Sequence, residues 1–206
     1  MKKRRMKKLN NKGYSLVELI IVIAIIVVLT GAAMITLNVM HSAKAKEAAI
    51  TFDSEISELI NKSKNRACDP NDDGVISEDP NGDGDLSDSE KNYTFGLRLH
   101  RVDNKCFLQE VLVKDGVYVE NDAYEKANNP NDGNGLSLSI YVNVTYTDLD
   151  GNVITIGDQP EDTVLISYKR NGTCATGFGT YEFTRTSGGA QVASMTLNKN
   201  GSHQSN

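Results

Sequence analysis

The chain begins with a long apolar stretch. No Lys, Arg, Asp or Glu occurs from Leu19 to Ala43, and most residues of 16–37 are Leu, Ile, Val, Ala or Met. Because a helix rises about 1.5 Å per residue, about 20 residues cross a hydrocarbon core about 30 Å thick. Backbone groups find no water inside lipid and must bond to one another. The stretch is therefore predicted to be a membrane-spanning helix.

After Ala43 the pattern becomes amphipathic. Residues 14–66 contain no Pro, and Gly31 is their only Gly. One helix is predicted over 14–66, with 14–43 in the membrane and 44–66 against a globular domain; the alternative is two helices that break near Gly31 or Asn38. The predicted core face recurs at spacings of three and four: Ala45, Ala48, Ala49, Phe52, Ile56, Leu59 and Ile60.

From Tyr93 onward the pattern has the period of β-strands. Residues 136–147 alternate in polarity, and turn residues such as Asp150-Gly151 separate the other apolar runs. The fold class is therefore α+β, with an antiparallel β domain over 93–206, in one or two sheets, packed on the second half of the helix. About eight strands are predicted, at 95–102, 106–113, 117–120, 136–147, 153–156, 164–170, 180–185 and 192–199, with a polar loop at 121–135.

Charge is distributed unevenly along the chain. Seven of the 22 basic residues and none of the 27 acids lie in 1–13, so the remaining 193 residues carry a net charge of −12. The basic end is expected to stay in the cytoplasm, which places everything after residue 43 outside. A body this acidic is not expected to bind nucleic acid directly.

Two ordinary explanations of the apolar stretch are incomplete. A cleaved secretory signal has a shorter apolar core followed by a small-residue site, which Thr30–Ala33 resembles. A plain anchor leaves Glu18 unexplained, because a carboxylate inside the apolar run is costly unless it is neutralised, hydrated or paired. Glu18 therefore either lies at the level of the lipid headgroups or has a functional partner.

Residues 12–26 (KGYSLVELIIVIAII) resemble the class III signal of type IV prepilins and pseudopilins. In that family a basic leader ends in Gly and is followed by an aromatic residue, Thr or Ser, Leu, and a Glu at the fifth mature position. The resemblance covers roughly the first 40 residues. Tyr replaces the commoner Phe, Ser replaces Thr, and a Pro that often follows is missing. The corresponding positions are Gly13, Tyr14, Ser15, Leu16 and Glu18.

The resemblance implies a pilin-like fold and a processing pathway. A membrane prepilin peptidase would cut between Gly13 and Tyr14, removing 1–13, and would N-methylate Tyr14. The Glu18 carboxylate would pair with the Tyr14 amine of a neighbouring subunit, since low dielectric strengthens the attraction of opposite charges. The expected partners are that peptidase, the assembly machinery in the membrane, and other pilins in a homopolymer or mixed filament.

The connection between helix and sheet, 67–92, is strongly acidic. Residues 69–90 hold nine acids and no Lys or Arg. Residues 79–90 fit the twelve-residue EF-hand loop, with Gly84 at its sixth position, and a weaker, dockerin-like copy begins at residue 69. A structural calcium ion is predicted; the alternative is a solvated acidic loop. The predicted ligands are Asp79, Asn81, Asp83, the Asp85 carbonyl, Ser87 and Glu90, and in the weaker copy Asp69, Asn71 and Asp73.

The three cysteines, Cys68, Cys106 and Cys174, lie outside the membrane in this topology, where disulfides persist. One disulfide between two of them and one free thiol are expected, and geometry decides which two pair. The sequence has no recognisable nucleophile–base pairing and no phosphate-binding loop, so no enzyme activity is predicted.

The sequence therefore predicts a structural subunit, a pilin or a minor pilin or pseudopilin, of a type IV pilus or related filament. Its domain would lie at the cell surface and serve adhesion, motility, DNA uptake or secretion. The alternative is a calcium-binding, membrane-anchored extracellular module that does not polymerise.

Overall fold

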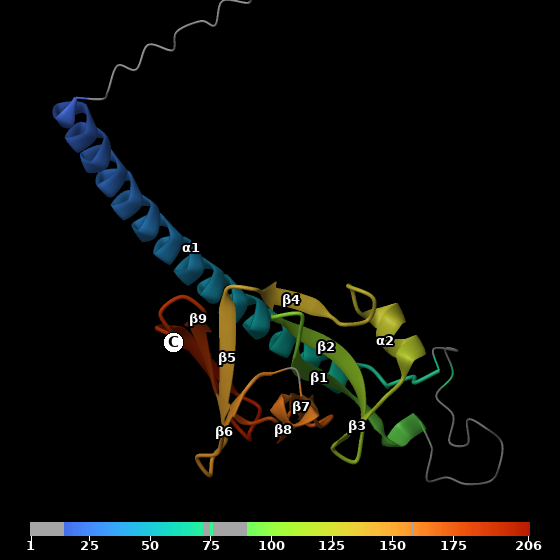
Figure 1. The fold of residues 1–206 in the computed structure, drawn as a ribbon. Coiled ribbons are helices and arrows are strands. Elements are labelled where there is room, and N and C mark those ends of the chain that lie inside the picture. The colour runs from blue at the N-terminus through green and yellow to red at the C-terminus, as the bar shows by residue number, and fades with distance from the viewer. Residues whose placement is uncertain (1–14, 72–74, 76–89, 158) are drawn as a thin grey trace, which may run out of the picture. The chain divides into compact units, whose positions relative to one another are not determined.

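The computed structural model describes residues 15–71, 75, 90–157 and 159–206. The chain forms two compact units, Met1–Val39 and Met40–Asn206. One helix, α1 (Leu16–Asn65), begins in the first unit and ends in the second (Figure 1). The prediction of one long helix on antiparallel sheets, and with it the α+β class, is confirmed. The alternative break at Gly31 or Asn38 does not occur.

The first unit exposes apolar side chains on every side of α1. Leu16 is 74% exposed, Ile21 53% and Val28 71%. Its polar side chains turn back onto the helix: the hydroxyls of Thr30 and Thr36 donate to the carbonyls four residues earlier, at 2.7 and 3.1 Å. The helix is long and apolar enough to cross a membrane. A helix that is apolar all round is stable in lipid or among other helices rather than in water.

In the second unit α1 lies in the core. All the predicted core-face residues are buried except Ile60, which is partly buried against the same core. Alanines at 45, 48 and 49 let the helix approach the sheets closely. The Phe52 ring then packs on Tyr181 and Phe183, with centroids 4.8 and 5.5 Å away. Every residue of the described core lies in this unit.

The larger sheet has the order β3-β2-β1-β7-β8, and β4 pairs with the other end of β2. The turns Asp103-Asn104 and Asp115-Gly116 have positive φ at both residues, as two-residue hairpins require to match strand twist. All pairs are antiparallel. The strands are β1 (Tyr93–Val102), β2 (Lys105–Lys114), β3 (Val117–Val119), β4 (Leu136–Ser139), β7 (Val164–Tyr168) and β8 (Cys174–Thr176).

The second sheet has the order β11-β10-β9-β5-β6 and is also antiparallel. Its inner face contributes Val144, Tyr181, Phe183, Met195 and Leu197 to the same core as α1. Two short 3₁₀ turns, η2 (Glu90–Asn92) and η3 (Pro160–Asp162), precede β1 and β7. The strands are β5 (Val142–Thr147), β6 (Val153–Thr155), β9 (Gly179–Arg185), β10 (Gln191–Leu197) and β11 (His203–Ser205).

The prediction of one strand over 136–147 was wrong. The chain turns at residues 140 and 141, so β4 joins the first sheet and β5 the second. Leu138 and Val142 are both buried, whereas Ile140 between them is 44% exposed. The Ser139 hydroxyl accepts a hydrogen bond from the Tyr141 amide at 3.1 Å and holds the corner. Burial in two different sheets thus overrides a regular alternation.

The predicted polar loop over 121–135 contains a short helix, α2 (Asp122–Asn128). The Asn121 side chain caps it by accepting from the Tyr124 amide at 3.0 Å. Its buried Glu125 accepts from Gln109 Nε2 at 2.8 Å and from the Tyr118 hydroxyl at 2.7 Å. These bonds hold α2 over β2 and β3. The strands β8 and β11, three residues each, were also missed because they are too short for a period to show.

Asn129 fills a gap in the edge of the first sheet. Strands β3 and β4 pair with opposite ends of β2 and leave Glu110 between them. The Asn129 side chain accepts from the Glu110 amide at 2.6 Å and donates to the Glu110 carbonyl at 2.8 Å. It also donates to the Glu125 carbonyl at 3.0 Å. One side chain therefore takes the place of a strand residue at an otherwise open edge.

We expect Asn129→Ala to destabilise the domain by about 2–3 kcal/mol, because it leaves the Glu110 amide and carbonyl without partners. Thermal unfolding of a 40–206 fragment measures this, since that unit contains the described core. Asn128→Ala is the matched control, because its side chain is exposed and donates only to the Tyr124 carbonyl. Equal losses in the two variants would contradict the role of Asn129.

Candidate functional site

The N-terminal end of α1 is a reciprocal cap. The Ser15 amide donates to Glu18 Oε2 at 2.9 Å, and the Glu18 amide donates to the Ser15 hydroxyl at 3.3 Å. This Ser-x-x-Glu arrangement is a capping box, which satisfies two otherwise unpartnered amides. The box was readable from the sequence, but it was missed. Glu18 therefore has a local role in addition to the predicted one.

The predicted partner of Glu18 is the Tyr14 amine of a neighbouring subunit. Gly13 and Tyr14, the predicted cleavage and methylation sites, lie outside the described residues. The Glu18 carboxylate lies in the first helical turn, where a negative charge interacts favourably with the helix dipole. Cleavage before Tyr14 would place a new amine one residue before Ser15. A role for Glu18 in subunit pairing stays a prediction.

The two described ends of the acidic segment meet near Cys68. Glu90 is only 2% exposed. Burial, together with the smaller effects of the Glu110, Asp69 and Glu90 charges, raises the pKa of the Cys68 thiol to about 12. Asp69 and Glu90, at opposite ends of the segment, are thus both within electrostatic range of one thiol.

The calcium site itself stays a prediction. Asn71 is described and exposed, but most of the predicted ligands lie outside the described residues: Asp73, Asp79, Asn81, Asp83, Asp85 and Ser87. Within the described ranges no three His, Cys, Asp or Glu side chains are grouped to hold a metal ion.

A partly buried ion pair links α1 to β2 and α2. Lys62 Nζ contacts Glu110 Oε2 and lies 3.1 Å from Glu58 Oε1, while the Tyr124 hydroxyl donates to Glu110 Oε1 at 2.7 Å. Burial alone would lower the pKa of Lys62, but Glu110 and Glu58 outweigh it and raise the pKa. The stabilisation is thus present at neutral pH and is lost as the pH rises through that raised pKa. These contacts are structural.

The expected disulfide does not form in the structure, where all three cysteines are buried free thiols. Cys106 pairs with Arg101 on β1, whereas Cys68 lines a small cavity beside Tyr93 at the other end of β1. Eight strand residues span roughly 26 Å, far beyond the reach of a disulfide. Cys174 is equally separated from Cys106, because its neighbour Tyr168 lies near the Phe95 end of β1.

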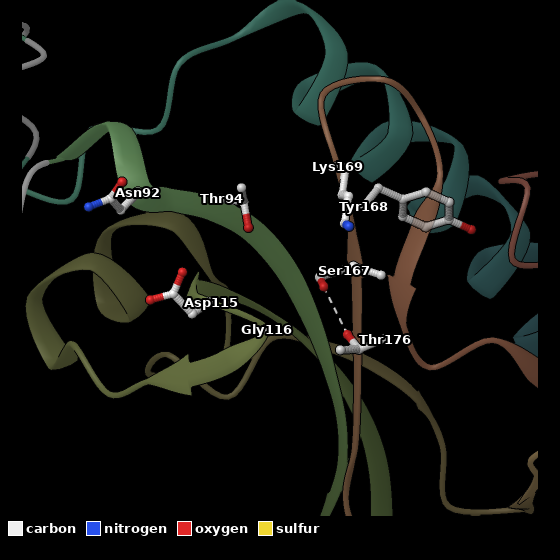
Figure 2. A pocket seen from close by; sticks show the side chains of 9 residues that line it. Asn92, Thr94, Asp115, Gly116, Ser167, Tyr168, Lys169 and Thr176 are labelled. Carbon is white, nitrogen blue, oxygen red and sulfur yellow. Dashed lines mark hydrogen bonds between the residues drawn. The ribbon is translucent and has the colours of Figure 1, made fainter. Parts of the chain in front are cut away.

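A polar groove of about 570 Å³ lies on the first sheet (Figure 2). The Ser167 and Thr176 hydroxyls, from paired strands, form a hydrogen bond of 2.8 Å in its lining. Asp115 and Lys169 stand on its rim, and the Tyr168 side chain points away from it. None of its nine lining residues is a His or a Cys. The groove offers hydrogen bonds and single charges but no nucleophile with an adjacent base.

Comparison with known proteins supports the N-terminal feature. Residues 8–34 match the family model of the prokaryotic N-terminal methylation motif. The chain therefore carries the class III signal of type IV pilins and pseudopilins, and the proteins defined by this motif are structural rather than enzymatic. No curated protein and no solved structure matches the chain. The apolar helix and the motif together fit anchoring in a membrane.

The thiols provide a direct test of the packing. Burial raises the pKa of Cys174 to about 11 and that of Cys68 to about 12, so both stay protonated at mildly alkaline pH. We expect no alkylation of the folded chain by iodoacetamide, and three alkyl groups per chain after unfolding without reductant. Intact mass spectrometry measures both. A single alkyl group after unfolding would instead reveal a disulfide.

Proposed function

We propose that the chain is a structural subunit, a pilin or a minor pilin or pseudopilin, of a type IV pilus or related filament. The observation that carries the proposal is the methylation motif at 8–34, which runs directly into an exposed apolar helix. In this proposal a prepilin peptidase cuts between Gly13 and Tyr14 and methylates the new amine. The β domain is then displayed at the cell surface for adhesion, motility, DNA uptake or secretion.

The exposed helix supplies the physical reason for polymerisation. Moving a helix with apolar side chains on all sides into water costs free energy, roughly 25 cal/mol for each Å² of apolar surface exposed. Once extracted from lipid it must pack against similar helices. The charge of Glu18 would then be buried, and a neighbour's Tyr14 amine would compensate it. Hydrophobic packing would drive association, and the ion pair would set the register.

Two substitutions at Glu18 separate pairing from capping. Gln can still accept the Ser15 amide in a capping box but carries no charge. We expect Glu18→Gln and Glu18→Ala to lower filament yield alike, because both lose the ion pair. The yield is measured as the chain recovered in sheared surface filaments.

Processing is the control for that experiment. Mass spectrometry of wild type and both variants should find a chain that begins at N-methylated Tyr14. Normal filaments from Glu18→Gln together with defective ones from Glu18→Ala would assign Glu18 to capping alone. A wild-type chain that retains residues 1–13 would instead favour a membrane-anchored module that does not polymerise.

We also propose that residues 79–90 bind a structural calcium ion. The spacing of oxygen ligands around Gly84 supports this. Without a cation, nine acids within 69–90 repel one another. Calcium would offset that repulsion and tie the end of α1 to the start of β1. A weak affinity, about 10⁻⁴–10⁻³ M, is typical of extracellular sites.

Calcium titration of a 40–206 fragment tests this second proposal. At millimolar calcium we expect a gain of about 1–2 kcal/mol, a rise in Tm of several degrees. Asp83→Ala should abolish the rise, and Glu120→Ala, an exposed acid outside the segment, should not. The same rise in Asp83→Ala as in wild type would show that any cation binds elsewhere.

A further inference from the structure

Six basic side chains from distant parts of the sequence gather around the β7–β8 turn. Arg66 and Arg170 line the same small cavity as Tyr93. Lys114 Nζ lies 5.4 Å from the centroid of the Tyr93 ring. We call this group the basic patch; its members are Lys64, Arg66, Lys114, Lys169, Arg170 and Lys199.

The remaining members join the patch through the backbone of the same turn. The end of the Lys64 side chain lies against Gly172. The Lys199 carbonyl accepts from the Cys174 amide at 3.1 Å, and Gly201 approaches the Gly172 carbonyl closely. Lys169 stands on the rim of the polar groove (Figure 2). The patch therefore joins the end of α1, the β2–β3 turn, the β7–β8 turn and the end of β10.

Two cations of the basic patch contact aromatic rings of their own subunit: Lys114 Nζ lies over Tyr93, and Lys199 Nζ lies 5.7 Å from the centroid of Phe178. Among the described residues none of the six forms an ion pair, whereas Lys44 and Lys62 do. Asp115 lines the same groove as Lys169 but is not paired with it. Six unpaired cations in a body with a net charge of −12 repel one another and gain from an external anion.

The surface around the β5–β6 hairpin is acidic rather than basic. No Lys or Arg occurs in 127–168, a run that contains six acids. Asp148 and Asp150 lie at the hairpin tip, with Glu161 and Asp162 in η3. Between these acids Leu149 is 70% exposed and Val153 62% exposed. We call Asp148–Asn152 the hairpin tip.

The hairpin tip is rigid. Asp148 Oδ1 accepts from the amides of Asp150 and Asn152 at 2.9 and 2.8 Å, and Oδ2 accepts from Asn152 Nδ2 at 2.8 Å. These hydrogen bonds with Asn152 lower the pKa of Asp148, which therefore stays ionised. An exposed apolar residue on a preorganised turn flanked by fixed charges costs little entropy to bind. The tip has the properties of a docking element.

We propose that the hairpin tip of one subunit docks on the basic patch of a second copy of this chain. The inference rests on the proposed filament function and names one contact between β domains. Tip and patch are different surfaces, so each copy can give one contact and accept another. Such a heterologous contact leaves both ends open, as a polymer requires. Opposite charges orient the approach, and the exposed Leu149 supplies apolar area.

Charge reversal in the full chain tests the contact. We expect Arg66→Glu with Arg170→Glu to lower sheared filament yield about tenfold, while processing at Tyr14 continues. Adding Asp150→Lys and Glu161→Lys to the same chain should restore the yield, because every copy then presents the reversed pair. Lys105→Glu with Lys126→Glu, exposed cations outside the patch, is the matched control and should have no effect.

A crosslink gives a second readout that does not depend on loss of function. Asp150→Cys with Arg170→Cys in one chain should form a ladder of disulfide-linked multimers in filaments, because the contact is heterologous. Each single substitution should form none. The native cysteines are buried and do not contribute. Dimers without a ladder, or no crosslink at all, would overturn the proposal.

Other outcomes would assign the basic patch to a different partner. Loss of monomer stability without rescue by the acid reversals would mean that the basic patch serves its own chain. If filaments form normally after the Arg reversals but no longer bind duplex DNA, the basic patch binds nucleic acid instead. If the wild-type chain forms filaments and the charge-reversed chain forms them equally well, this inference alone is overturned. A wild-type chain that never polymerises overturns the proposed function as well.

Discussion

One backbone, α1, must satisfy two environments, and the rest of the molecule follows from that constraint. Up to Val39 its apolar side chains are exposed on every side and need lipid or other helices around them. From Ala45 onward the same helix keeps one apolar face for its own sheets. Burial of the apolar side chains of the first part, up to Val39, must come from lipid or from other chains. The apolar face of the second part is buried against the sheets of the same subunit.

The second part of α1 is fixed by shape and by a partly buried ion pair. Alanines at 45, 48 and 49 remove bulk where the sheets approach, and Phe52 then fills the space beside Tyr181 and Phe183. Lys62 alone would be costly to bury, but Glu110 and Glu58 compensate it. The same Glu110 residue is held through its backbone by Asn129. Helix, sheet and α2 are therefore coupled through one residue.

The sequence predicted what local periodicity can encode. The core face of α1 and hairpin turns such as Asp103-Asn104 were visible because their patterns repeat over neighbouring residues. The corner at Ile140 was not, because which sheet each half joins depends on distant partners. The positions of the cysteines were not readable for the same reason, because only strand register places Cys106 at the far end of β1 from Cys68. The basic patch unites residues as distant as Lys64 and Lys199, so net charge concealed it.

The apolar helix and the charged surfaces of the β domain have complementary properties. Hydrophobic packing of α1 is strong but non-directional, since leucine, isoleucine and valine side chains tolerate many rotations and shifts. It can hold subunits together without specifying how they are arranged. Charges on rigid elements such as the hairpin tip are weak individually but depend steeply on position and sign. A chain with both features can separate the energy of association from the choice of register. In the proposed contact, the cations of the basic patch, which form no ion pair among the described residues, would be available to a second acidic copy.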